Sequence, residues 1–174
     1  MAGDDAFGSL VARELRTMVP CGMEVVDLGM KPAALLDYLA DRTAVCIVDA
    51  AIDERLPTGT LIEVDFCDPD RPRLAHDRVL SSHGLSVADQ LELASRLDLL
   101  PDDIRLVAVV IRSADRGCLP DIEVASQVPA AAGRIVQWAE QLHRSTGDLG
   151  RPEGQYCRQA AQSLLEDRSE DLKP

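Results

Sequence analysis

The chain has 174 residues, which suits one domain of ordinary size with a sizeable buried core. Its formal net charge is −12 at pH 7 and its pI is about 4.6, so its surface repels nucleic-acid phosphates and anionic lipid headgroups, and we expect neither partner. The sequence has no apolar run of the roughly 20 residues that span a bilayer, and its start lacks the basic and apolar regions of a signal peptide, so we expect a cytoplasmic protein.

The first part of the chain predicts two helices with a strand between them. Apolar residues recur at helical spacing over residues 6–18, and Asp4 or Asp5 directly precedes this run, where a carboxylate favours a helix start. The apolar residues of this stripe are Phe7, Leu10, Val11, Leu15 and Met18. Residues 21–29 predict a short strand, and residues 31–42 predict a second helix with a proline near its first turn.

Two strands and a loop are predicted next. Residues 43–50 form an apolar, β-branched run of the kind found in buried strands, and we expect the strand to end at Asp49. Residues 59–66 alternate more strongly between apolar and polar, which favours a strand nearer the sheet edge. Residues 67–81 contain two prolines and several charges, so they predict a long loop.

The second half of the chain continues the alternation of helices and strands. Residues 86–100 predict a helix and residues 104–112 predict another buried strand. Residues 122–144 carry one apolar helical face, and Pro129 kinks or restarts that helix. Residues 145–174 are polar and irregular, and we interpret them as a C-terminal tail.

This order of elements predicts the α/β fold class. Strands that alternate with helices are typical of a three-layer α/β/α sandwich with a mostly parallel central sheet, and we assign residues 1–144 to one such domain. The first helix is an exception, because an α/β fold of this kind normally begins with a strand and residues 1–5 supply none.

Three ionisable residues stand where an α/β fold usually carries chemistry. Asp5 lies at the entry to the first helix, Asp49 at the end of the most apolar strand, and His83 in a loop that leads into a helix. In open α/β sheets, ligands bind beyond the carboxyl ends of the strands. Each residue also has a structural interpretation, since Asp5 could cap the helix, Asp49 could belong to a turn, and His83 could be a solvated loop residue.

The sequence lacks the motifs of several other classes of functional site. The five cysteines form no CxxC pair and are odd in number, so a zinc knuckle or a disulfide framework is not expected, and Cys46 reads as a small core residue. The sequence contains no GxGxxG after a strand, no GxxxxGK[ST], no GxSxG and no HExxH. These absences disfavour dinucleotide, nucleoside triphosphate, serine hydrolase and zincin sites.

Five segments, in order, resemble the hydrogenase maturation protease family: GDDAFGSLVAREL, VVDLG, CIVDA, PTGTL and SSHGLSVADQLELA. The resemblance runs from Gly3 to about Arg144. It implies a parallel-sheet α/β/α fold and an endopeptidase that removes the C-terminal extension from the large-subunit precursor of nickel–iron hydrogenase, after nickel insertion. Matched residue by residue, the family's nickel-interacting and catalytic residues fall on Asp5, Asp49 and His83, with the nickel supplied by the substrate and not permanently bound.

The sequence departs from this family at two places. Leu28 stands where the family usually has a second glycine, although Gly29 still matches. The family's first strand, an apolar run that ends in a GN turn, has no counterpart. Loss of a central strand leaves backbone groups of its neighbours unpaired, so we expect either a native start upstream or a less stable form that is prone to associate.

The sequence is also compatible with two other functions. One is a non-catalytic protein of the same fold that binds a partner, and the other is a different metal-dependent hydrolase that uses the same three groups. Carboxylate oxygen and imidazole nitrogen both ligate nickel, and such an ion polarises a scissile carbonyl or lowers the pKa of an attacking water. The oligomeric state, the partner subunit and the cleavage point are not determined by the sequence.

Overall fold

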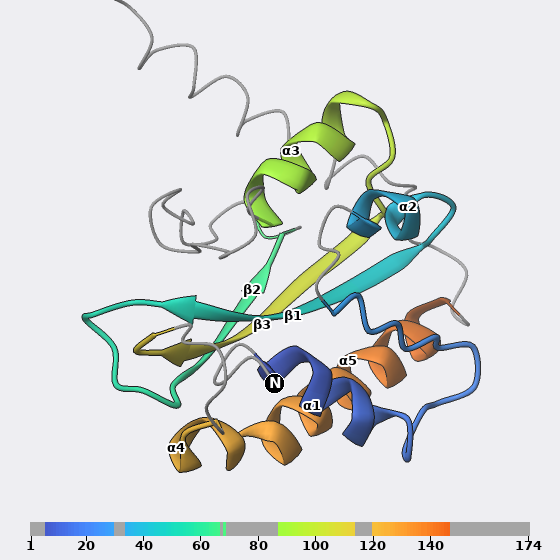
Figure 1. Ribbon diagram of the computed structural model, residues 1–174. Coiled ribbons are helices and arrows are strands. Elements are labelled where there is room, and N and C mark those ends of the chain that lie inside the picture. The colour runs from blue at the N-terminus through green and yellow to red at the C-terminus, as the bar shows by residue number, and fades with distance from the viewer. Residues whose placement is uncertain (1–5, 30–33, 67, 69–86, 114–119, 147–174) are drawn as a thin grey trace, which may run out of the picture. The chain divides into compact units, whose positions relative to one another are not determined.

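The computed structural model describes residues 6–29, 34–66, 68, 87–113 and 120–146. These residues form five helices and three strands (Figure 1). In chain order the elements are α1 (Phe7–Leu15), α2 (Leu35–Leu39), β1 (Ala44–Ile52), β2 (Leu61–Asp65), α3 (Val87–Arg96), β3 (Asp103–Ile111), α4 (Ile122–Ala125) and α5 (Val128–Thr146). The α/β class predicted from the sequence is therefore confirmed.

The three described strands form one sheet in the order β1-β3-β2, with β3 between the other two. This order explains why almost every residue of β3 is buried, whereas β1 is only half-buried along most of its length. The sequence predicted both as buried strands, because both are apolar and β-branched. Among the described strands, however, only β3 has a neighbour on each side. The prediction that residues 59–66 form a strand nearer the edge is confirmed by β2.

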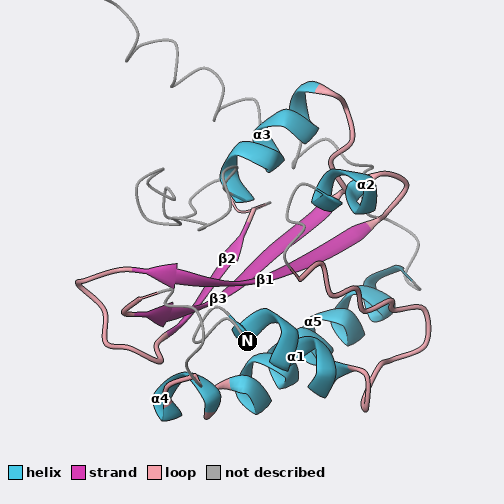
Figure 2. Cartoon of the chain, in the orientation of Figure 1, coloured by secondary structure: helices cyan, strands magenta, loops and turns pink. Residues whose placement is uncertain are grey.

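The described sheet is mixed. The Phe66 N–H donates to the Ile104 carbonyl at 2.9 Å and the Val110 N–H donates to the Thr60 carbonyl at 2.9 Å, so residue numbers rise along β3 as they fall along β2. These two strands are therefore antiparallel. The arrows of β1 and β3 point the same way in Figure 2. The short connection 53–60 between β1 and β2 accounts for the reversal, because a parallel return needs a crossover of a dozen or more residues.

The chain divides into two compact units, and each of the three described strands contributes residues to both. The first unit comprises Met1–Gly29, Val48–Glu63 and Val107–Arg151, and it contains α1, α4 and α5. The second unit comprises Met30–Ile47, Val64–Leu106 and Pro152–Pro174, and it contains α2 and α3.

In the first unit, α1 packs against α5 and α4 (Figure 1). Phe7 and Val11 are fully buried on α1, and Ile135 and Trp138 are buried on α5. Burial of one large apolar side chain contributes about 1.5–3 kcal/mol, so this contact is a main source of the unit's stability. The helical stripe predicted for residues 6–18 is confirmed as far as Leu15, but Met18 lies beyond the end of α1 and is 39 % exposed.

A two-residue turn at Ser126 and Gln127 separates α4 from α5. Helix α4 ends at Ala125, and Pro129 is the second residue of α5, where its missing N–H has no partner to lose. The predicted helix 122–144 is thus two helices, and proline restarts the second.

In the second unit, α2 packs against α3 (Figure 1). Leu35 and Leu39 of α2 and Leu91 and Ala94 of α3 are buried. The helix predicted at 31–42 is confirmed in a shorter form, and α3 ends several residues before the predicted helix 86–100 does.

The strand predicted at residues 21–29 is wrong. Residues 21–22 form a turn, residues 23–28 have no regular structure, and the segment joins none of the described strands. Its apolar residues suggested a strand, yet its backbone is held by local bonds. The Met23 N–H donates to the Pro20 carbonyl, and the Gly29 N–H donates to the carboxylate of Asp27.

A tight ion pair follows β1 in the first unit. Arg55 donates from its Nη2 to Asp53 Oδ2 at 2.8 Å and from its Nε to Oδ1 at 3.0 Å. The side chain and the backbone N–H of Arg55 both bond this carboxylate, which lowers the pKa of Asp53 from 3.8 to about 2. Because the folded-state pKa lies below the ordinary value, ionised Asp53 stabilises the fold above about pH 4. That contribution is lost as the pH falls toward 2.

We expect Arg55→Gln to raise the pKa of Asp53 toward its ordinary value, because both side-chain hydrogen bonds from the guanidinium disappear. The measurement is an NMR titration of the Asp53 carboxyl carbon in both proteins. A midpoint that is the same in wild type and variant would show that Arg55 does not control this carboxylate.

Candidate functional site

Of the three site residues predicted from the sequence, the structure describes Asp49. Asp5 and His83 lie outside the described residues. Asp49 is a half-buried residue within β1, and three more residues of the strand follow it. The expectation that the strand ends at Asp49 is wrong. Ala50 and Ala51 are small and buried, so the strand continues past the carboxylate to Ile52.

The Asp49 side chain is held by its own strand. Its Oδ1 accepts a hydrogen bond from the Ala50 N–H at 2.8 Å. A hydrogen bond from a backbone N–H restricts rotation of the side chain that accepts it. One oxygen of the Asp49 side chain is therefore oriented by the backbone of its own strand.

The start of α1 lies directly on this part of β1. A Cβ atom on Gly8 would come within 3.1 Å of the Val48 carbonyl oxygen, so only a residue without a side chain fits this contact comfortably. Gly8 is the second residue of α1, and Val48 immediately precedes Asp49. The first turn of the helix that follows Asp5 in sequence is thus packed against the strand that carries Asp49.

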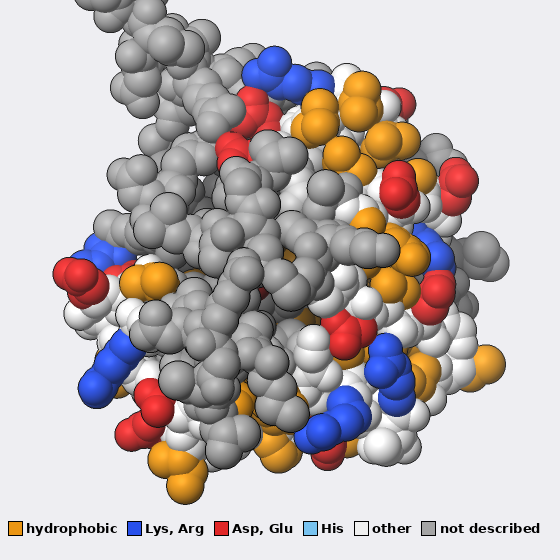
Figure 3. Space-filling model, in the orientation of Figure 1, with side chains coloured by type: hydrophobic (Ala, Val, Ile, Leu, Met, Phe, Trp, Pro, Cys, Tyr) orange, Lys and Arg blue, Asp and Glu red, His pale blue; other side chains and the backbone are white. Residues whose placement is uncertain are grey.

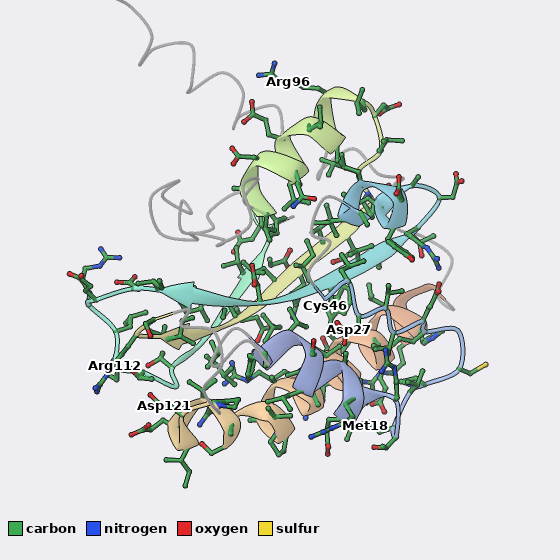
Figure 4. All side chains as sticks on the ribbon, in the orientation of Figure 1. Met18, Asp27, Cys46, Arg96, Arg112 and Asp121 are labelled. Atoms are coloured by element: carbon green, nitrogen blue, oxygen red, sulfur yellow. The ribbon has the colours of Figure 1, made fainter. Side chains whose placement is uncertain are left out.

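Asp27 is a further acidic residue, and it contacts α1 through Ser9. It was not predicted from the sequence as a site residue. Figure 4 shows it beside this helix. Its Oδ1 accepts from the Ser9 hydroxyl at 3.0 Å and from the Gly29 N–H at 3.0 Å. The second bond closes a turn in which Gly29 has a φ of 52°. The DLG tripeptide is the part of the sequence that could have indicated this turn. The hydrogen bond with Ser9 could not have been predicted from local sequence, because Ser9 lies 18 residues away from Asp27.

The connection between β1 and β2 is anchored at Gly59. Its N–H donates to the Val110 carbonyl at 2.8 Å, its φ is 83°, and an added Cβ would lie 2.9 Å from the Glu123 carbonyl oxygen. Arg112 donates from Nε to the Thr58 hydroxyl at 3.1 Å. These contacts fix the loop that leaves the Asp49 strand against β3 and α4.

No group of three or more His, Cys, Asp or Glu residues suited to a metal ion occurs among the residues that the structure describes. The predicted set of Asp5, Asp49 and His83 includes two residues outside that part of the chain, so the set stays a prediction. None of the described helices is both long and apolar enough to cross a lipid bilayer. On the face shown in Figure 3, acidic and basic side chains of the described residues are interspersed.

Comparison with known protein families finds the hydrogenase maturation protease model, which matches residues 10–138. The chain belongs to the hydrogenase maturation protease family. This confirms the family to which the sequence motifs pointed, and it identifies the protein as an endopeptidase, a hydrolase that acts on peptide bonds. Asp49 and His83 lie within the matched residues, and Asp5 precedes them.

Named relatives agree with this assignment. The hydrogenase 2 maturation protease of Escherichia coli (strain K12) is 29 % identical over 124 residues, which cover 69 % of this chain and 74 % of that protein. The solved structure of the hydrogenase maturating endopeptidase of E. coli matches with a TM-score of 0.65 at 21 % identity, covering 80 % of this chain and 86 % of that one. The nickel–iron hydrogenase maturation protease of Thermococcus kodakarensis matches with a TM-score of 0.62 at 22 % identity, covering 80 % and 92 %. These structures show that this maturation protease shares their fold.

Proposed function

We propose that this maturation protease removes the C-terminal extension of a nickel–iron hydrogenase large-subunit precursor after nickel has been inserted. Asp5, Asp49 and His83 interact with the nickel that the precursor carries, so the ion belongs to the substrate and is not a resident cofactor of the protease. Family membership supports the hydrogenase maturation role.

The contact between Gly8 and the Val48 carbonyl is the structural observation that best supports this proposal. It packs the first turn of α1 against the strand residue that precedes Asp49. Asp5 is three residues before Gly8 in the sequence, so it directly precedes, along the chain, the helix turn that packs against the Asp49 strand. We propose that the contact between Gly8 and Val48 marks one side of the nickel-recognition site.

The residue types fit the chemistry. Carboxylate oxygens and an imidazole nitrogen are suitable ligands for nickel. When the nickel-loaded precursor is bound, the ion supplies Lewis acidity next to the scissile bond. On the protease side, the Ala50 N–H holds the Asp49 carboxylate in one orientation, which reduces the reorganisation needed when substrate arrives.

The position of the cut tests the proposed reaction. We expect the protease to release one peptide from the C-terminus of the nickel-loaded precursor, measured by intact mass of both products. We also expect Asp5→Asn and His83→Ala each to lower the cleavage rate at least about tenfold, because each removes a ligand that the substrate ion needs.

His143→Ala is the matched control for the histidine variant. His143 is an exposed residue near the end of α5, and removing it should leave the cleavage rate unchanged. Release of a peptide from elsewhere in the precursor, or equal rates for His83→Ala and wild type, would contradict the proposed function.

A further inference from the structure

We propose that the first turn of α1 is a positioning element for Asp49, seated on β1 by Gly8 and held in place by the Ser9–Asp27 hydrogen bond. The inference rests on the proposed function of Asp49, and it names Gly8 and Ser9 as positioning residues for the endopeptidase reaction. Neither residue is proposed to touch the substrate.

The start of α1 has few of the usual anchors among the described residues, so contacts with its neighbours matter more for its position. Ala6 occupies the N-cap position, none of the described side chains makes a cap hydrogen bond there, and the first turn contains no acidic residue to interact with the helix dipole. The first backbone N–H groups of a helix without a cap are weakly held, and such an end frays readily. A frayed first turn would leave the backbone at Val48 without its packing partner.

Gly8 supplies the first anchor. The gap between its Cα and the Val48 carbonyl is so narrow that an added Cβ would lie 3.1 Å from that oxygen. This distance is shorter than the distance that a real Cβ atom normally keeps from a neighbouring atom. An alanine at position 8 would therefore displace either the helix or the strand by a few tenths of an ångström. The strand residue that would move is Val48, which directly precedes Asp49 in the chain.

Ser9 supplies the second anchor. Its hydroxyl donates to Asp27 Oδ1 at 3.0 Å, and the same oxygen accepts the Gly29 N–H, so the acceptor is itself held by a closed turn. Phe7 and Val11 bury the opposite side of the helix in the core. The first turn is thus held by the core, by the strand backbone and by the Asp27 turn. Ser9 and Asp27 are exposed, so their bond contributes little to global stability and can act mainly on local position.

The test compares kcat and KM for cleavage of the nickel-loaded precursor with resistance to urea, monitored by the fluorescence of Trp138, the only tryptophan. We expect Ser9→Ala and Gly8→Ala each to lower kcat about three- to tenfold with little change in KM, because a small misplacement of a reacting group slows the chemical step. Ser9→Thr keeps the hydroxyl and should restore most of the rate lost in Ser9→Ala. Gly133→Ala is the matched glycine control, since Gly133 lies in α5 with no atom within 4 Å of an added Cβ, and its rate should equal that of wild type.

A double-mutant cycle shows whether Ser9 acts through Asp27. If it does, Ser9→Ala lowers kcat in the wild-type background and has no further effect in the Asp27→Ala background. Equal effects in the two backgrounds would overturn the role of this hydrogen bond. A kcat for both Ser9→Ala and Gly8→Ala that matches wild type would overturn the whole inference.

The same assay separates failure of this inference from failure of the proposed function. Asp49→Asn is included in every series. If Asp49→Asn is inactive while Ser9→Ala and Gly8→Ala cleave at the wild-type rate, only the positioning role is wrong. If Asp49→Asn cleaves at the wild-type rate, the role that the proposed function gives to Asp49 is wrong, and the positioning role falls with it.

Discussion

Replacing Asp49 by asparagine should lower cleavage of the nickel-loaded precursor by about 100-fold while leaving the protein folded. The amide is nearly isosteric with the carboxylate, and its oxygen can still accept the hydrogen bond from the Ala50 N–H, so the strand is preserved. The negative charge is lost, and with it the contact of an anionic oxygen with the substrate's ion that we propose for Asp49. The measurement is the rate of peptide release, followed by mass, for equal amounts of folded enzyme.

Asp121→Asn is the matched control for this charge removal. Asp121 is the exposed N-cap residue of α4, and asparagine serves as well as aspartate at that position. The control should cleave at the wild-type rate. If Asp49→Asn also cleaves at that rate, the anionic character of Asp49 has no part in the reaction.

Gly59→Ala should destabilise the first unit by about 2–4 kcal/mol, which makes it the largest stability effect that we expect. The residue has a φ of 83°, a conformation that costs an alanine free energy, and the new Cβ would lie 2.9 Å from the Glu123 carbonyl oxygen, which belongs to the backbone. Relief of this clash requires α4 or the loop 53–60 to move. Urea unfolding followed by Trp138 fluorescence measures the change in the free energy of unfolding.

Gly133→Ala should change stability in the opposite direction. Its added methyl meets no neighbouring atom, and alanine is favoured over glycine in a helix interior by up to about 1 kcal/mol. A Gly59→Ala protein as stable as wild type would mean that the loop does not make the close approach to α4 described above.

Much of the fold follows from local periodicity. The spacing of Phe7, Val11 and Leu15 predicted α1, and the same residues form its buried face. The apolar run at residues 106–111 of β3 predicted a buried strand, and β3 is the central one of the described strands. In α1 and β3, the apolar side chains whose spacing predicted the element are the same side chains that are buried in the core.

Periodicity failed where tertiary contacts decide the structure. Residues 21–29 have strand-like side chains, but a strand needs a neighbouring ladder, and here local hydrogen bonds hold the backbone instead. The reversed direction of β2 was likewise not visible, because an alternating pattern fixes which face is buried and not which way the strand runs.

The candidate site was predictable in part. An ionisable residue at the end of an apolar run pointed to Asp49. The continuation of β1 to Ile52 was not predicted, because it depends on the burial of two alanines that have no strong strand preference. The roles of Gly8 and Ser9 could not be predicted from the sequence. One depends on the distance to the Val48 carbonyl, and the other on a partner 18 residues along the chain.

In our proposal, nickel in the precursor is the signal for cleavage. The most direct measurement incubates the protease with precursor prepared with and without nickel, all else equal, and follows release of the C-terminal peptide by mass. We expect release from the nickel-loaded precursor and none from the nickel-free precursor over the same time. Equal release from both would contradict the claim and would assign Asp5, Asp49 and His83 a role other than recognition of the substrate's nickel.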